Sequence, residues 1–413
     1  MAFKRLPVLL VVMVIIAAGV WAFFFYTQET QEFRLIPKEV AVQEYSGAGP
    51  TEVGTGWSVK GNPEEAVAEA VAMALAGKKQ AAPHFAVLFA NSGSDLPAVL
   101  SAARKRLEGK TKIYGGTSDS RALMINKKFV RMGSPPHAVE TRVQGVAIMT
   151  VTSEEITFGV GSADFAKYPS VQQAAREATR QAMANAGKSP AEIPQAVLIT
   201  PTFGPEDQVL EGIAAVVGTD ALILGGTAGG PKFGVFGEHG VYETGLSLAV
   251  LYTHLPLAWI FEGGFDTVDT PSGIVTKMAG RDILEIDHRP ALEVYDQWLG
   301  GQVSTLIREG ADLRKIRDVL TLHPLVRRYA APGGQDFLLF SHPYPTKKAL
   351  SDKSISTSTN IQPGDRVYLS HGTWETLLNR IGNLPLNAKV RSLYRIRFSG
   401  HKFFLSRQGR VLS

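Results

Sequence analysis

Two glycine-rich stretches that also carry hydroxyl side chains are the best candidates for ligand-binding chemistry in this sequence. Residues 115–120 read GGTSDS, and residues 225–230 read GGTAGG. Glycine permits positive φ and brings backbone N–H groups close to a bound carboxylate, and Thr and Ser hydroxyls add further hydrogen bonds. Each stretch follows a short apolar run that predicts a β-strand. Because ligands of open α/β sheets bind beyond the carboxyl ends of the strands, these stretches predict a site for a small polar molecule.

Two further predicted strands end in small, uncharged residues that can form hydrogen bonds. The first glycine-rich stretch is also the more charged, since it holds Asp119 and is followed by Arg121, where the second has Gly229 and Pro231. We therefore expect the first stretch to hold the charged groups of a ligand. The alternative is that all these segments are tight turns that the fold requires. The predicted ligand-binding residues are Asn91, Ser92, Gly116, Thr117, Ser118, Asp119, Arg121, Thr200, Thr202, Gly226 and Thr227.

The sequence lacks the motifs of several common chemistries. It has no G-x-G-x-x-G fingerprint, no P-loop and no G-x-S-x-G elbow, and none of its nine His stand at metal-ligand spacing. It has no Cys, which excludes thiol nucleophiles and Cys-ligated metals. We therefore expect no cofactor, no metal site and no catalytic residue. A hydrolase acting on a small polar substrate would need Ser92 or Thr117 paired with His84 or His288, and no spacing joins these residues.

An internal duplication positions the candidate residues. A helix is expected to begin at Asn62, where an N-cap residue precedes a proline and two acids. A shift of 110 residues aligns AVL at 86–88 with AVL at 196–198, and GGT at 115–117 with GGT at 225–227. A helix–strand–helix–strand pattern repeated at one offset indicates two copies of one structural unit.

The duplication predicts an α/β domain over residues 57–265, an internally duplicated α/β sandwich with approximate two-fold symmetry. Strands that are apolar on both faces need cover on both sides, which favours helices packed against a sheet. We expect a strand pair after each copy, 145–151 with 156–160 and 246–252 with 257–261. The symmetry should bring the matching turns to a shared hollow.

A smaller α+β domain is expected over residues 266–385. Strands are predicted at 273–278 and 282–286, followed by helices at 290–299 and about 302–309. Residues 386–413 form a basic tail with seven Lys or Arg and no Asp or Glu, and its alternating pattern predicts β-strands. Outward arginines on such strands discourage aggregation, and contact with an anionic surface is the alternative.

Composition and the N-terminus bound the class of protein. The 413 residues are 45% apolar and 20% charged with a net charge of +5, which excludes disorder and predicts no nucleic-acid partner. Residues 6–26 hold no charge over 21 positions, and at about 1.5 Å per residue they can cross a hydrocarbon core of about 30 Å. Lys4 and Arg5 place the start of the chain in the cytoplasm. We expect a transmembrane anchor over 1–26, or a cleaved signal peptide, and a polar linker over 27–56.

Several segments together resemble a known family. GWSVKGNPEEAVAEAV, FAVLFANSGSD, IYGGTSDS and LILGGTAGG resemble the N-terminal half of FIST sensory domains. GIVTKMAGRDILEIDHRPALEVYDQWLG, LHPL and STSTNIQPGDRVYLSHG resemble the C-terminal half, so that the similarity covers most of residues 57–380. The resemblance implies a sensor of small molecules in bacterial signalling, with amino acids as ligands. The missing Cys, the basic tail and the anchor depart from the family pattern.

The sequence therefore predicts a membrane-anchored sensory protein, not an enzyme. Its ligand would be an amino acid or a similar polar metabolite, and its signal would pass through a signalling protein partner. Residues 6–26 would hold it in the bacterial inner membrane as a single-pass protein with the globular part periplasmic or extracellular, and cleavage would instead give a secreted protein. The two alternatives to a sensory protein are a hydrolase that acts on a small polar substrate and a non-enzymatic protein-interaction scaffold.

Overall fold

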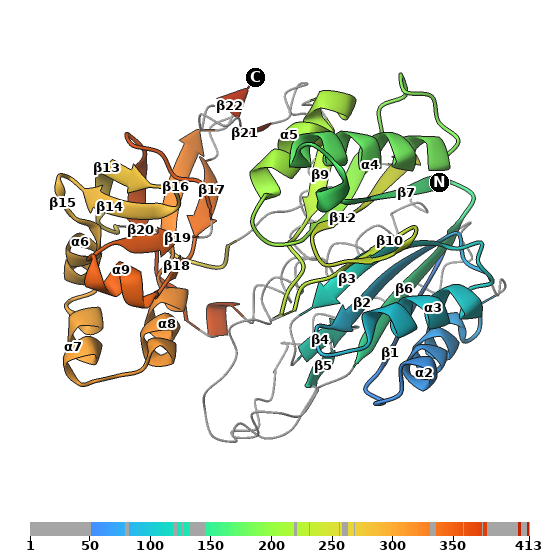
Figure 1. Cartoon of the computed structure of the whole chain (residues 1–413), viewed down its shortest axis with the longest axis horizontal. Coiled ribbons are helices and arrows are strands. Elements are labelled where there is room, and N and C mark those ends of the chain that lie inside the picture. The colour runs from blue at the N-terminus through green and yellow to red at the C-terminus, as the bar shows by residue number, and fades with distance from the viewer. Residues whose placement is uncertain are drawn as a thin grey trace, which may run out of the picture. The chain divides into compact units, whose positions relative to one another are not determined.

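The chain divides into two compact units, Met1–Trp259 (unit 1) and Ile260–Ser413 (unit 2). The computed structural model is drawn in Figure 1. It describes residues 51–78, 82–118, 122–125, 128–131, 145–218, 221–230, 232–255, 257, 263–267, 269–330, 336–357, 359–373, 375–377, 404–405 and 411–412.

The first half of unit 1 is a sheet with two helices. Its main elements are β1 (Thr51–Ser58), α2 (Pro63–Leu75), β2 (Phe85–Asn91), α3 (Leu96–Arg106), β3 (Lys112–Ser118) and β6 (Val146–Ser153). The strands lie in the order β1-β6-β2-β3, with β2 and β3 parallel and the other pairs antiparallel. As predicted, Asn62 caps α2, because its side chain accepts a hydrogen bond from the backbone N–H of Glu65.

The second half repeats this topology. Its elements are β7 (Ile156–Asp164), α4 (Val171–Asn185), β8 (Ala196–Pro201), α5 (Glu206–Val217), β9 (Leu222–Gly225) and β12 (Gly245–Thr253), with a short 3-10 helix at Phe165–Lys167. The strand order β7-β12-β8-β9, with β8 and β9 parallel, is that of the first sheet. The predicted duplication is therefore confirmed.

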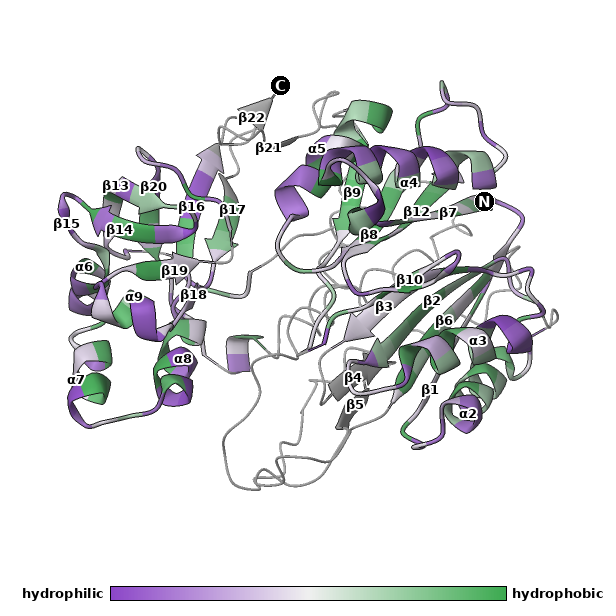
Figure 2. Ribbon diagram, viewed as in Figure 1, coloured by the Kyte–Doolittle hydropathy of each residue, from purple (hydrophilic) through white to green (hydrophobic). Residues whose placement is uncertain are grey.

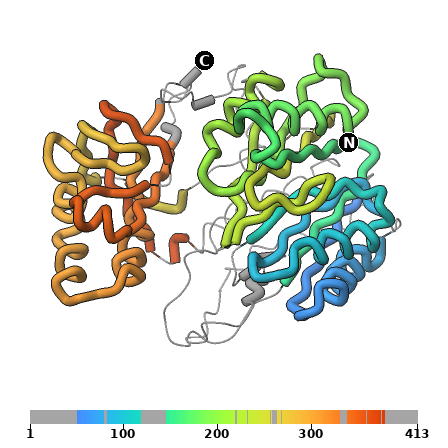
Figure 3. Tube along the Cα trace, in the orientation of Figure 1, coloured from blue at the N-terminus to red at the C-terminus, as the bar shows by residue number. Residues whose placement is uncertain are grey.

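Each half also contains a hairpin after its parallel strands. In the first half β4 (Ala122–Ile125) pairs with β5 (Lys128–Arg131) as a separate two-stranded sheet. In the second half β10 (Val235–Gly237) pairs with β11 (Gly240–Tyr242) and also with β3, through Val235 and Gly116. The second half thus extends the sheet of the first half to six strands, and the Cα trace in Figure 3 shows the course of this segment.

The two sheets pack face to face, and the helices cover their outer faces (Figures 1 and 2). One apolar cluster lies between the sheets and includes Phe85, Phe158 and Leu198. A second cluster joins α2 and α3 to the first sheet, and a third joins α4 and α5 to the second. Unit 1 is therefore a four-layer α–β–β–α sandwich. The sequence predicted cover on both faces of each sheet, and the structure supplies it with helices on one face and the other sheet on the second.

Two further predictions for unit 1 were wrong. The strand pair 145–151 with 156–160 does not form, since β6 pairs with β1 and β2 whereas β7 begins the second sheet and pairs with β12. The linker assigned to 27–56 overlaps β1, which begins at Thr51. The glycines of this segment suggested a flexible linker, but their role is steric.

Gly54 and Gly56 let α2 lie directly on β1. A Cβ on Gly54 would lie 1.7 Å from the carbonyl oxygen of Ala74, and one on Gly56 would lie 1.8 Å from that of Ala70. The alanines, four residues apart, lie on one face of the helix and have short side chains. The glycines, on alternate positions of the strand, lie on the face that packs against these alanines. Close helix–strand packing therefore fixes these residue types.

The same device recurs in the second half of unit 1. A Cβ on Gly159 or Gly161 would lie 1.9 Å from the carbonyl oxygen of Ala182 or Ala178 of α4. The recurrence of glycines on the first strand and alanines on the first helix shows that both copies keep the same interface.

We predict that Gly161→Ala destabilises unit 1 by about 1–3 kcal/mol, because the added methyl group pushes α4 off β7. The melting temperature should fall by roughly 2–10 °C in differential scanning fluorimetry. Gly61→Ala is the control, since a Cβ there meets no atom within 4 Å. Equal melting temperatures for wild type and Gly161→Ala would contradict the steric explanation.

Unit 2 combines one sheet, whose described strand pairs are all antiparallel, with four helices named below. Its strands are β13 (Ser272–Ala279), β14 (Asp282–Ile286), β15 (Arg289–Pro290), β16 (Leu325–Ala330), β17 (Asp336–Ser341), β18 (Pro343–Tyr344), β19 (Ile355–Thr357) and β20 (Arg366–Leu369). Its helices are α6 (Ala291–Trp298), α7 (Gln302–Arg308), α8 (Leu313–Leu322) and α9 (Lys347–Ser351). The predicted strands at 273–278 and 282–286 and the two predicted helices are confirmed.

The termini are described only in part. Among the residues that the structure describes, none of the helices has both the length and the apolar character that a membrane span requires. The predicted anchor at residues 6–26 lies outside the described residues, as does most of the basic tail. Within that tail β21 (Phe404–Leu405) pairs with β22 (Val411–Leu412) as an antiparallel hairpin.

Unit 2 holds a pair of neighbouring histidines, one buried and one exposed. His323 is buried at the end of α8, with its Nδ1 atom 3.3 Å from Nδ1 of His371 and 3.3 Å from the carbonyl oxygen of Ser370. Burial lowers the pKa of His323 and the nearby His371 lowers it further, whereas the hydrogen bond to Ser370 raises it. The folded state therefore binds this proton less well than the unfolded state does.

We predict that unit 2 loses stability as the pH falls below about 6.5, the pKa of an unperturbed histidine, because protonation of His323 then favours the unfolded state. The melting temperature of wild type should fall between pH 7.5 and 5.5 more steeply than that of His323→Gln. The exposed His239 provides the control variant His239→Gln, which should keep the wild-type slope. A His323→Gln slope equal to that of wild type would exclude His323 as the titrating group.

Candidate functional site

The described ligand-binding candidates of the first half lie at the carboxyl ends of β2 and β3 and are buried, and all of them except Ser92 belong to the strands. Asn91 and Ser118 are paired as the last residues of the parallel ladder, so residues 115–118 of the turn predicted at 115–120 are part of β3. Thr117 is only 1% exposed. The strand continues through Gly116 because β10 pairs with it on the open side.

The segment between β9 and β10 holds the end of β3 through hydrogen bonds to Thr117. The N–H of Thr117 donates to the carbonyl of Gly234 at 2.8 Å, and the N–H of Gly234 donates back to Oγ1 of Thr117 at 3.1 Å. The N–H of Gly229 donates to the carbonyl of Thr117 at 2.9 Å. The two glycine-rich stretches therefore meet, as the symmetry argument predicted. They do so by direct contact, whereas the prediction was that they would line a shared hollow.

Gly230 completes this contact by lying against Ser92. Gly230 has a φ of +103°, and a Cβ there would lie 2.2 Å from Oγ of Ser92. Ser92 is 4% exposed, and its Oγ has no hydrogen-bond partner within the described part of the chain. A residue with a side chain therefore cannot replace Gly230 without moving the end of β2.

In the second half, two of the predicted hydroxyls also make contacts within the protein. Oγ1 of Thr200 lies 2.7 Å from the phenol oxygen of Tyr114 across the two sheets. Oγ1 of Thr202 accepts a hydrogen bond from the N–H of Gly245 at 3.0 Å. Burial raises the pKa of Tyr114 well above its usual range, so this phenol stays protonated and the hydrogen bond persists. Both threonines therefore hold the fold together at this end of the sheets.

Gly226 and Thr227 are the more accessible of the predicted residues, since both are partly exposed. Oγ1 of Thr227 donates to Oε1 of Glu206 at 3.0 Å, and the N–H of Gly204 donates to the same oxygen at 3.1 Å. Glu206 is the first residue of α5, so its carboxylate is held at the end of the second sheet by two loop groups. The carboxyl group of Glu206 therefore lies against the glycine-rich loop at Thr227.

Two aromatic rings lie in the same loops. Phe203 is 49% exposed, and its ring stacks on Phe233 with centroids 6.0 Å apart and an interplanar angle of 20°. Sequence reasoning missed Phe203, Glu206 and Phe233. The available signal was an acidic residue at the start of a helix that directly follows a strand, but such an acid is also what a helix N-terminus ordinarily prefers.

Asp119 and Arg121, the predicted charged residues of the first copy, lie outside the described residues. The pairing of His84 with Ser92 or Thr117 is excluded, because His84 immediately precedes β2 whereas Ser92 follows it. At about 3.3 Å per residue the strand separates them by about 25 Å. His288 belongs to unit 2. The described residues contain no group of three or more His, Asp or Glu that could hold a metal ion.

Comparison with known proteins gives the family. Residues 84–289 match the family model of the FIST N domain. This part of the chain belongs to the FIST family. The match spans the second strand of unit 1 to the start of the sheet in unit 2, and it gives no separate support to the resemblance of the later segments.

Other comparisons give little for this FIST N domain. No curated protein matches the chain. Among solved structures, the crystal structure of cyanuic acid hydrolase from A. caulinodans aligns at 11% identity with a TM-score of 0.28. The alignment covers 55% of this chain and 72% of that one. At this TM-score the likeness carries no argument on fold or function.

We predict that Gly230→Ala lowers stability by about 1–3 kcal/mol, because the methyl group meets Ser92 and the backbone keeps a positive φ. Adding Ser92→Gly should recover part of the loss by removing the clash and leave the part due to backbone strain. Urea unfolding of wild type, both single variants and the double variant measures this coupling. Additive effects would show that the two residues do not touch in solution.

Proposed function

We propose that the chain is a small-ligand sensory protein whose FIST N domain binds an amino acid or a similar polar metabolite at the loop ends of its second half. The FIST family is one of small-ligand sensory domains, and residues 84–289 belong to it. The observation that carries the proposal is the carboxylate of Glu206, held by Thr227 and Gly204 in the same group of loops as the Phe203–Phe233 pair. We call Gly204, Glu206, Thr227 and the Phe203–Phe233 pair the second-half site.

The chemistry of the second-half site suits a ligand with an amino group. A carboxylate that is already oriented by two hydrogen bonds needs no reorganisation to attract an ammonium group. The face of an aromatic ring also attracts a cation, so Phe203 adds to the same preference. Asp119 and Arg121 of the first stretch remain predicted to hold charged groups of the ligand.

In this proposal the protein acts by binding and not by catalysis, and its signal leaves through a protein partner. The apolar segment 6–26 would anchor it in the bacterial inner membrane with the globular part on the outer side, or would be cleaved to release it. The exclusion of the His84 pairing with Ser92 or Thr117 supports binding over hydrolysis.

We predict that an amino acid from a panel of the twenty raises the melting temperature of the full chain. A ligand at 100 times its Kd adds about 2.7 kcal/mol of stability, which corresponds to roughly 5–10 °C. Glu206→Gln should weaken binding at least about tenfold, because it removes the charge that the ammonium group meets. Glu64→Gln is the matched control, an exposed glutamate in the first turn of α2.

Isothermal titration calorimetry of the same variants gives the affinities. An unchanged Kd for Glu206→Gln would show that the ligand binds elsewhere. If none of the amino acids, nor any of a wider library of polar metabolites, binds wild type, then the sensory proposal fails and the scaffold alternative gains.

A further inference from the structure

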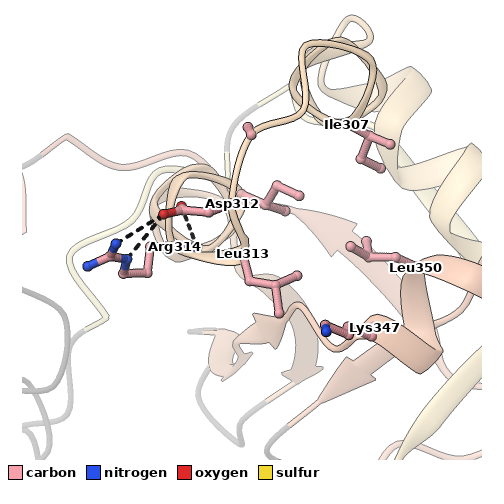
Figure 4. A pocket seen from close by; sticks show the side chains of 8 residues that line it. Ile307, Asp312, Leu313, Arg314, Lys347 and Leu350 are labelled. Atoms are coloured by element: carbon pink, nitrogen blue, oxygen red, sulfur yellow. Dashed lines mark hydrogen bonds and ion pairs between the residues drawn. The ribbon is translucent and has the colours of Figure 1, made fainter.

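A hollow of about 540 Å³ lies in unit 2 between α7, α8 and α9 (Figure 4). This volume falls within the range of about 300–1,000 Å³ that is common for small-molecule sites. Figure 4 shows Ile307 from α7, Leu313 from α8 and Leu350 from α9 on its walls, with Lys347 at its edge. The hollow lies outside the second-half site and outside the residues that the FIST N family model matches.

The walls of the hollow are aliphatic. Ile307 is 44% exposed, and Leu313 and Leu350 are partly exposed, whereas Ile316 is buried behind them. Aromatic side chains do not line the hollow. A flexible alkyl chain would cover these side chains and remove their apolar surface from water, which is the main driving force for such binding.

The charges around the hollow favour an anionic head group. The carboxylate of Asp312 is already engaged, because it accepts hydrogen bonds from the backbone N–H groups of Arg314 and Lys315 at 3.0 Å and pairs with the Arg314 guanidinium at 3.2 Å. Lys348 pairs with Asp352 at 3.3 Å. Lys347 has no ion-pair partner within the described residues, so it is the cation left to meet a ligand.

We propose that this hollow binds a single-chain fatty acid. The alkyl chain of the fatty acid lies against Ile307, Leu313 and Leu350, and the carboxylate of the fatty acid faces the ammonium group of Lys347. The proposal is independent of the function proposed for unit 1.

Photolabelling of the full chain tests the site directly. The chain, in phosphatidylcholine nanodiscs, is labelled with decanoic acid that carries an aliphatic diazirine, and the labelled peptides are identified by mass spectrometry. The label should attach to the peptides of α7, α8 and α9. Unlabelled fatty acids are then added as competitors of the photolabel. Their affinity for the hollow should rise about fourfold for each methylene added, so decanoate should compete about 15-fold better than octanoate.

Variants separate the contributions of chain and head group. Ile307→Asn should abolish labelling without unfolding the protein, since this side chain is largely exposed. Lys347→Gln should weaken competition by decanoate about two- to fivefold and leave competition by neutral decanol unchanged. Lys348→Gln is the matched control on the same helix and should behave as wild type.

Circular dichroism of each variant confirms that it is folded. Labelling spread evenly over the chain, or competition that does not depend on alkyl length, would overturn the proposal. So would a Lys347→Gln variant that loses competition by decanol as much as by decanoate, since the loss would then not be electrostatic.

Discussion

The burial of one sheet against the other is the constraint on which unit 1 depends. Each sheet has one face covered by its own helices, so the other face can leave water only by meeting the second sheet. The rings of Phe85 and Phe158 stack within this interface with centroids 4.5 Å apart. Because the two halves are copies, both present a matching apolar face, and neither half can bury that face alone.

This interface also decides what the candidate site can be. It brings Tyr114 of the first sheet to Thr200 of the second, and the hairpin β10–β11 then crosses to pair with β3. The segment that leads into this hairpin covers the end of the first sheet, where Thr117 forms hydrogen bonds with Gly229 and Gly234. The equivalent residues of the second sheet keep partly exposed groups at Gly226 and Thr227. A symmetric duplication has therefore produced an asymmetric pair of loop ends.

The two proposals place different chemistry in the two units. Unit 1 offers a hydrogen-bonded carboxylate and a pair of aromatic rings in the same loops, which suit a small polar cationic group. Unit 2 offers aliphatic walls with one lysine, which suits an apolar chain with an anionic head. A sensory protein that carried both sites could respond to a soluble metabolite and to a fatty acid through separate parts of one chain.

The sequence by itself determined the local elements and the repeat, because apolar periodicity, helix caps and a fixed offset are all recorded in adjacent residues. Asn62, the strand at 85–90 and the matching GGT stretches were enough for that. Only the tertiary structure decided what covers each face and which groups meet. Gly54 suggested a linker because the reason for a glycine there is not local. The helix that packs on it, and that leaves no room for a side chain, contacts it through Ala74, twenty residues along the chain. Glu206 was missed because its partners, Thr227 and Gly204, become a site only when two strands end side by side.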